Sequence, residues 1–447
     1  MKKKYVRWTL WTIASPFILF IILCILIYLP PIQNFLVDKA AVYASEATGM
    51  NISVGRISLS FPLNLVVTDV DAASPHNDTL LSVRRLQVNV QLLPLLKKQV
   101  EVDGISLQGA TVNSNDLIHG MKLNGTLGEL FISSHGVALD PETAIVNKVL
   151  LKDTDLSLCL NDTAAADTAA SDTTYWKIIL QDIDLQNVSF ALDMPLDSLS
   201  LAASLDNAIL RDGLIDLHKS AYSLQTFRIE NGRVRYDNGK PLAADSLSSG
   251  LDPSHIALTD IGVKLDSLYY GGRNMKAIIS QFVLKERSGV EIVSATGRMV
   301  SNDKVLRVPS LKLETRDSYL ELNAAMDWNA LDFKDEGLVS ARLMADIGKP
   351  DVVRFMGSMD EKFIRQYPSE PLRIRTGIDG DLNKLKLTTL TAELPGALGL
   401  FARGELTHLT DSLLRGGDIT LEAETKDLKF VSTLAEGIEI PYGTRLE

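Results

Sequence analysis

A short phrase of alternating apolar and polar residues recurs along the chain and constrains its fold more than any other feature. Residues 105–112 are matched by residues 183–190 and by residues 227–236. In each copy a Gly or Asn interrupts the alternation, which then resumes. A period of two is typical of β-strands with one apolar face, and Gly and Asn tolerate the positive φ of a bulge or tight corner. The phrase therefore predicts a mainly β protein.

The arrangement of these strands stays open at this point. Repeated phrases of this kind build an elongated sheet rung by rung, whereas their irregular spacing also fits an ordinary large β-sandwich. The apolar fraction of 46% exceeds what a solvated array of repeats would need. The surplus apolar surface therefore has to be covered by another apolar surface.

The clearest apolar stripe lies in residues 178–192. Side chains at alternate positions share one face of a strand, so a curled sheet would turn this face into a continuous groove. Acyl chains could slide along such a groove, because each buried CH₂ contributes ~0.8 kcal/mol without any directional contact. A closed, dry core is the alternative for the same stripe. The candidate groove residues are Ile178, Leu180, Ile183, Leu185, Val188, Phe190 and Leu192.

The N-terminus predicts a membrane anchor. Residues 8–29 contain no charge, and four basic residues precede them: Lys2, Lys3, Lys4 and Arg7. A helix of this length spans about 33 Å, enough to cross a hydrocarbon core. The positive-inside rule keeps the N-terminus in the cytoplasm and exports the rest. A cleaved signal peptide is the alternative, but the apolar run is long for one and no small-x-small cleavage site follows.

Other segments divide the chain. Residues 32–48 predict an amphipathic helix that ends at Gly49, and residues 351–367 predict a second helix that covers an open apolar face or lies on the surface. Residues 161–175 are a low-complexity loop rich in Asp, Thr and Ala. We expect a tip and anchor (1–29), an N-terminal region (30–115), a sheet continuation (116–160), this loop, and a repetitive elongated sheet (176–447).

The sequence shows no constellation for catalysis, metal or cofactor binding. Its six histidines are scattered singly, and neither a nucleophile elbow nor a phosphate-binding Gly-rich loop occurs. Asp182 and Asp184 alternate with Ile183 and Leu185, which indicates the solvated face of a strand rather than an acid–base pair. The net charge of −11 argues against nucleic acid as a partner. We therefore expect a protein that is not an enzyme and has no cofactor.

The N-terminal region resembles the AsmA family, and its TamB-like members in particular. Residues 49–57 match the family's helix end, Gly and short strand, and residues 92–96 with 100–112 resemble its second signature segment. The resemblance implies a curled, taco-like β-sheet with an open apolar groove, anchored in the inner membrane by one span, with a periplasmic body. The chain departs from the family's long members because its strand pattern runs to residue 447 with no closing element, so we expect either a fragment or a sheet that ends in an exposed edge.

Function follows from this resemblance as an expectation. Such a protein would bridge the inner and outer membranes and carry phospholipid along its groove. Two alternatives remain: a scaffold that helps an outer-membrane β-barrel protein to assemble, and a structural envelope tether with a closed core. The expected partners are phospholipid and the inner membrane, with an outer-membrane β-barrel protein as a further partner.

Overall fold

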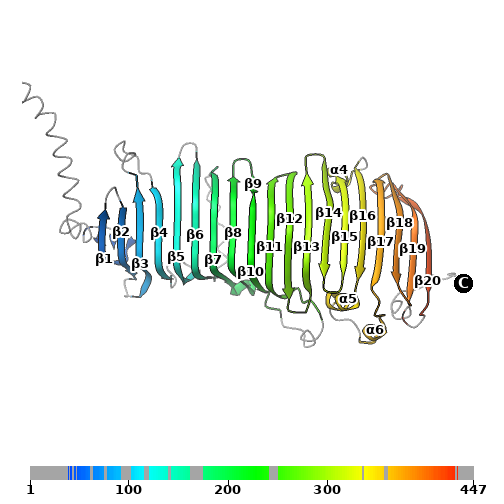
Figure 1. Ribbon diagram of the computed structural model, residues 1–447, viewed down its shortest axis with the longest axis horizontal. Coiled ribbons are helices and arrows are strands. Elements are labelled where there is room, and N and C mark those ends of the chain that lie inside the picture. The colour runs from blue at the N-terminus through cyan, green and yellow to red at the C-terminus, as the bar shows by residue number, and fades with distance from the viewer. Residues whose placement is uncertain are drawn as a thin grey trace, which may run out of the picture. The chain divides into compact units, whose positions relative to one another are not determined.

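The protein is mainly β, as its alternation predicts. The structure is a computed structural model that describes residues 39, 41–42, 45–46, 48–60, 64–74, 78–91, 102–114, 120–138, 142–161, 175–240, 250–334, 337–356, 361–427 and 430. The chain divides into two compact units, Met1–Leu196 and Asp197–Glu447. Strands in each unit lie side by side (Figure 1).

The described residues of the first unit form seven strands in chain order. They are β1 (Asn51–Ser60), β2 (Asn64–Ala73), β3 (Thr79–Val90), β4 (Val102–Asn113), β5 (Met121–Ala138), β6 (Thr143–Leu160) and β7 (Lys177–Met194). Each strand pairs antiparallel with the next, except that β6 and β7 are parallel. A short 3₁₀ turn, η1 (Pro195–Asp197), follows β7.

The described residues of the second unit form thirteen strands. They are β8 (Leu199–Asp216), β9 (Ala221–Leu224), β10 (Thr226–Asp237), β11 (His255–Gly271), β12 (Asn274–Glu286), β13 (Glu291–Ser301), β14 (Val305–Thr315), β15 (Tyr319–Asp327), β16 (Leu338–Ile347), β17 (Leu372–Asp381), β18 (Lys384–Leu394), β19 (Leu398–Thr407) and β20 (Gly416–Thr425). β8 pairs with both β9 and β10, and from β10 to β20 each strand pairs antiparallel with the next.

The positions where the alternation slips are left-handed residues, as predicted. Gly109, Asn187 and Asn231 have φ of 63°, 51° and 53°. Neighbouring strands slip together in the first unit: Leu107 pairs with Leu130 and Gln108 with Glu129 before the slip, and Ala110 pairs with Leu127 after it. The kink therefore preserves the pairing register. It also keeps the apolar side chains before and after it on one face of the sheet, whereas a strand that changed face would place the later ones on the opposite side.

Asn187 offers a test of this kink. Its side chain donates a hydrogen bond from Nδ2 to Oδ1 of Asp153 over 2.9 Å. A β-branched residue is disfavoured at positive φ, so Asn187→Val is expected to destabilise the first unit by about 1–2 kcal/mol. Asn187→Gly, which relieves the strain, is the control and should stay within ~1 kcal/mol of the original protein in urea unfolding. Equal stability of the two variants would contradict a requirement for positive φ.

The helix predicted at residues 351–367 is wrong as a single element. Two helices occupy this region, α5 (Lys349–Met356) and α6 (Glu361–Gln366). Residues 357–360, between the two helices, lie outside the described residues. A third short helix, α4 (Trp328–Leu331), connects β15 and β16.

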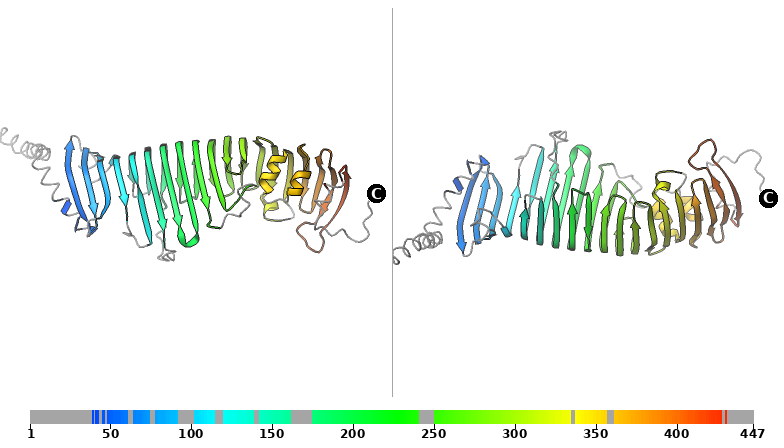
Figure 2. Two further views of the ribbon diagram at one scale, coloured as in Figure 1. Left: turned by 90° about the horizontal axis from the view of Figure 1, so that it is seen from below. Right: turned by 90° about the horizontal axis from the view of Figure 1, so that it is seen from above.

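The predicted cover over an apolar face is confirmed for α5 and α6, which lie together beside the strands of this unit (Figure 2). Val352 of α5 and Phe363 of α6 pack on a buried cluster. That cluster consists of Tyr367, Leu394, Ala397 and Phe430. The rings of Phe363, Tyr367 and Phe430 lie with each pair of centroids 5.7 Å apart.

The N-terminal predictions are tested only in part. Gly49 has φ of 69° and donates its N–H to the carbonyl of Ser45 over 2.9 Å, so it ends a helical turn as predicted. Among the residues that the structure describes, no helix is long and apolar enough to cross a membrane. The predicted anchor at residues 8–29 lies outside the described residues, as do residues 162–174 of the predicted loop.

A buried histidine holds the start of β11. The ring of His255 is 8% exposed; its Nδ1 lies 2.8 Å from Oδ2 of Asp252 and its Nε2 lies 3.5 Å from Oδ1 of Asp237. The hydrogen bond with His255, and then that from the backbone N–H of Ser254, lower the pKa of Asp252 below its ordinary value of 3.8. Both ring nitrogens face carboxylates, so the arrangement holds a strand end in place.

The lowered pKa of Asp252 makes a prediction about acid stability. A carboxylate whose pKa is lower in the folded state contributes stability above its unfolded pKa and loses it as the pH falls through the folded value. Asp252→Asn should therefore be less stable than the original protein at about pH 5, and this difference should shrink towards about pH 3. Thermal melting of both proteins across this range measures it. A difference that grows on acidification would contradict the direction of the shift.

Candidate functional site

All seven candidate groove residues lie on one face of the first unit. In the parallel register of β6 and β7, Leu151 pairs with Leu185 and Leu156 pairs with Phe190. Paired residues point to the same side of a sheet. The β7 residues on this side are Ile178, Leu180, Ile183, Leu185, Val188, Phe190 and Leu192, and their β6 partners are Ala144, Val146, Val149, Leu151, Thr154, Leu156 and Leu158.

The same face continues across the whole first unit. Following the register from β7 to β1 traces rows of side chains that cross all seven strands. One row consists of Leu185, Leu151, Leu130, Leu107, Leu86, Val67 and Ile57. The next consists of Ile183, Val149, Ile132, Ile105, Val88, Leu65 and Leu59. At ~4.8 Å between strands, each row is about 29 Å wide. We call this side of each unit's sheet the apolar face.

The apolar face of the first unit is not a closed core. Its side chains are mostly half-buried, and Phe190 and Ile105 are 39% and 37% exposed. Among the described residues of this unit, only Ala72, Leu80 and Val83 are buried apolar residues. A sandwich would bury such rows against a second sheet. Contiguous exposed apolar surface of this extent is typical of a binding surface.

The opposite side of the same strands is mixed, with Asp182 and Asp184 beside apolar residues such as Leu150 and Phe131. Asp182 pairs with Lys148, and Asp184 pairs with Leu150, on the side away from Ile183 and Leu185. The slip in the alternation is thus the feature that keeps leucine and isoleucine on one face and carboxylates on the other. This placement agrees with the sequence interpretation of the two aspartates as surface residues of a strand.

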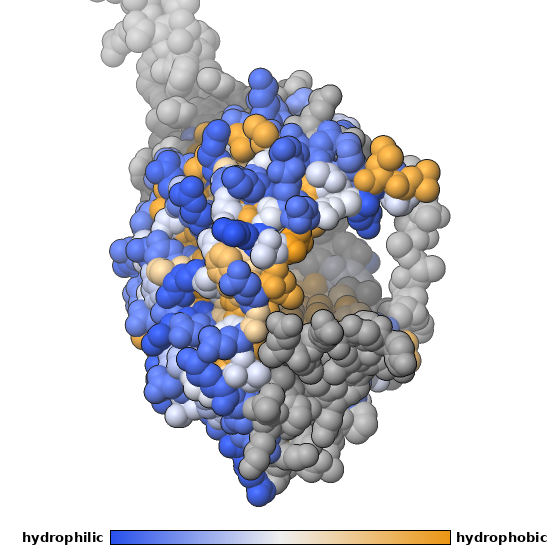
Figure 3. Space-filling view, turned by 90° about the vertical axis from the view of Figure 1, so that its right-hand side faces the viewer, coloured by the Kyte–Doolittle hydropathy of each residue, from blue (hydrophilic) through white to orange (hydrophobic). Residues whose placement is uncertain are grey.

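The second unit has an apolar face built in the same way. One row runs from β14 to β20 through Leu311, Leu322, Leu343, Thr376, Leu390, Ala402 and Leu421. The adjacent row contains Leu313, Leu320, Ala345, Ile374, Ala392, Leu400 and Ala423. Figure 3, which faces the C-terminal end of this unit, shows hydrophobic side chains gathered beside a hollow and hydrophilic ones on the outer surface.

One end of this second apolar face is covered. Leu372 of β17 and Leu398 of β19 lie on it, and both contact the buried cluster on which α5 and α6 pack. Along the rows of this unit, Leu311, Leu322 and Leu343 are half-buried, Ala345 and Ala402 are buried, and Leu421 and Ala423 are exposed. The two helices therefore close the face locally near β17–β19.

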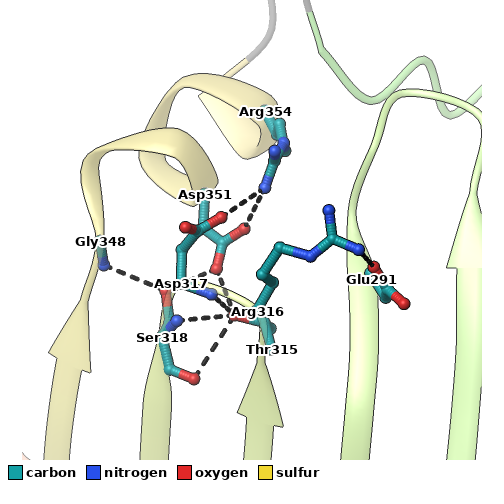
Figure 4. Close-up of polar contacts among 8 residues, drawn as sticks. All are labelled: Glu291, Thr315, Arg316, Asp317, Ser318, Gly348, Asp351 and Arg354. Carbon is teal, nitrogen blue, oxygen red and sulfur yellow. Dashed lines mark hydrogen bonds and ion pairs between the residues drawn. The ribbon is translucent and has the colours of Figure 1, made fainter.

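A buried polar network fixes α5 to the hairpin between β14 and β15 (Figure 4). The Asp351 side chain, 1% exposed, accepts hydrogen bonds from the hydroxyl of Thr315 and, over 2.6 Å, from that of Ser318. Arg354 donates from Nη1 to Asp351 over 3.1 Å and to Asp317 over 2.8 Å. Burial alone would lower the pKa of Arg354, but its bonds to the two carboxylates outweigh burial and raise it.

Sequence reasoning missed this network and the His255 contacts. Asp351 was placed only at the start of a helix, and nothing in the alternation signals that Thr315 and Ser318, more than thirty residues earlier, lie beneath it. The sequence feature that could have indicated the contact was the acidic residue in the first turn of an amphipathic helix. Within the described residues, no group of histidine, cysteine or acidic side chains is arranged to hold a metal ion.

Comparison of the sequence with protein-family models and with curated proteins finds no match. The geometry of the two apolar faces is therefore what the function has to be argued from. These faces offer long rows of mainly aliphatic side chains, which suits long, flexible apolar ligands rather than a small polar substrate.

Proposed function

We propose that this chain carries phospholipid along its apolar face between the inner and outer membranes of a two-membrane envelope. The observation that carries the proposal is the pair of aliphatic rows that cross all seven strands of the first unit while their side chains stay half-exposed. A soluble protein gains little from such a surface unless something apolar covers it.

Acyl chains suit this face for a physical reason. They need burial but no fixed hydrogen bonds, so a row of leucine, isoleucine and valine side chains can hold them at many equivalent positions. A ligand that binds similarly at successive positions can move along the sheet without crossing a high barrier. The phospholipid head group, which is charged, would stay in water beside the strand ends.

The proposal also includes the cellular location of this chain. The uncharged residues 8–29 behind four basic residues would anchor the chain in the inner membrane with its body in the periplasm. The resemblance of residues 49–57 and 92–112 to TamB-like members of the AsmA family supports the same assignment, with a curled sheet whose apolar face forms an open groove.

Site-specific photo-crosslinking in cells tests the proposal with the full chain. A benzophenone-bearing phenylalanine analogue at Phe190 or Leu185 should form adducts of phospholipid mass, detected by mass spectrometry of the purified protein. The same analogue at Gln186, which is exposed one residue along the strand and faces away, is the control. Adducts of equal yield at Gln186 and Leu185, or none at either apolar position, would reject a lipid path.

A further inference from the structure

Three turns at one end of the strands of the second unit join into a single lobe. They are α4 with the residues that follow it (328–334), the turn between β17 and β18 (382–383) and the turn between β19 and β20 (408–415). Ala330, Val339 and Leu382 form a buried cluster, and Leu409 packs against it. The N–H of Leu409 also donates to the carbonyl of Leu382 over 2.8 Å. These contacts hold the three turns together, and we call them the apolar lobe.

The outer surface of the apolar lobe carries large apolar side chains that stand in solvent. Leu413 and Leu414 are 92% and 62% exposed, and Leu331 and Phe333 are 46% and 60% exposed. Phe333 also has φ of 60°, a conformation that is strained for a bulky residue and that its exposed ring does not offset by packing. At the other end of the strands (Figure 1), the described residues of α5 and α6 expose one large apolar side chain, Phe355. Exposed apolar groups that gather at one place are typical of an interaction site.

Backbone N–H groups at the tips of the apolar lobe are already paired within it. The Oδ1 atom of Asp411 accepts hydrogen bonds from the N–H of Leu413 over 2.8 Å and from that of Leu414 over 3.3 Å. The N–H groups of residues 332–334 donate to the carbonyls of residues 328–330 over 2.7–3.0 Å. A backbone donor without a partner is costly where water is excluded. These tips can therefore enter an apolar environment without that cost for the N–H groups named.

Basic and aromatic side chains border the exposed leucines. Arg273 pairs with Asp332 over 2.9 Å, and its guanidinium lies 5.2 Å from the centre of the Trp328 ring. Lys334 pairs with the same carboxylate over 3.5 Å, and Arg415 is exposed in the turn between β19 and β20. Leucine beside tryptophan and basic residues is the composition that lies at the surface of a bilayer, where cations meet phosphate groups and apolar side chains meet acyl chains.

We propose that the apolar lobe inserts into the surface of a phospholipid bilayer, with Leu331, Phe333, Leu413 and Leu414 at the boundary between head groups and acyl chains. A fluid bilayer accepts side chains at any spacing, whereas a partner protein would need a separate matching pocket for each turn. The mixed charge of the lobe suits zwitterionic phospholipid. This inference stands on the turns of the second unit and holds whether or not the apolar face carries lipid.

Fluorescence quenching by spin-labelled lipid tests the proposal in the full chain. A Cys24→Ser, Cys159→Ser protein carries Leu413→Cys labelled with the fluorophore NBD. It is reconstituted into vesicles of phosphatidylcholine and phosphatidylethanolamine, with protein-free vesicles of the same composition in excess. Lipid with a spin label near the head group should quench this probe about threefold more than a probe at Phe355→Cys, at the other end of the strands. Phe333→Asp with Leu414→Asp should lower the quenching at position 413 to that at position 355.

The controls separate insertion from misfolding and from the lipid path. Leu413 is 92% exposed, so its replacement removes little packing, and the circular dichroism of the variants should match that of the original protein. Leu185→Asp, on the apolar face of the first unit, should leave quenching at position 413 unchanged. Equal quenching at positions 413 and 355, or none at position 413, would overturn the proposal. So would photo-crosslinks in cells from position 413 to a protein instead of lipid, because the lobe would then be a protein interface.

Discussion

With the proposed lipid path, Leu185→Asp is expected to remove most of the phospholipid that purifies with residues 33–447, a loss of at least tenfold in lipid per chain. Leu185 is the β7 member of a row of seven aliphatic residues that runs from β7 to β1. A carboxylate there would lose its hydration against an acyl chain without gaining a partner, which costs several kcal/mol. Lipid extraction followed by mass spectrometry measures the loss.

Two comparisons make this result specific to the apolar face. Gln186→Asp adds a carboxylate one residue along β7 but on the opposite side, so its lipid content should match that of the original protein. Leu185 is half-buried, so the variant should remain folded by circular dichroism. An unfolded Leu185→Asp protein together with no lipid in the original protein would indicate a closed core and a tether.

Asp351→Ala is expected to destabilise the second unit by about 3 kcal/mol, the largest effect that we expect of a single truncation. The substitution removes the acceptor of three side chains, from Thr315, Ser318 and Arg354, and leaves buried donors without it. Urea unfolding followed by tryptophan fluorescence measures the change. α5 should also lose protection in hydrogen exchange, because Asp351 holds it to the β14–β15 hairpin.

Asp332→Ala is the matched control for a carboxylate in a surface ion pair. Asp332 is 34% exposed at its side chain and pairs with Arg273 over 2.9 Å, so its loss should cost less than about 1 kcal/mol. Asp351→Asn keeps a hydrogen-bond acceptor and should fall between the two alanine variants. Equal effects of Asp351→Ala and Asp332→Ala would show that the buried network contributes nothing beyond a surface pair.

The local features of this fold could be predicted from short stretches of sequence. Alternation along residues 178–192 identified a strand with one apolar face, and the Gly or Asn at each slip identified a left-handed residue. Gly49 identified the end of a helix. Each of these depends on backbone preferences and side-chain direction within a few neighbouring residues, which a single strand or turn already determines.

Interactions between distant segments were decided only by the tertiary structure. The parallel pairing of β6 with β7, the alignment of Leu185 with leucines from four other strands, the separation of α5 from α6, and the contact of Asp351 with Thr315 all join residues far apart in the chain. Alternation fixes which side of its own strand a residue occupies but not the neighbouring strand or its register. The sequence by itself therefore determined that apolar strand faces exist, and the pairing of the strands determined that they join into a continuous surface within each unit.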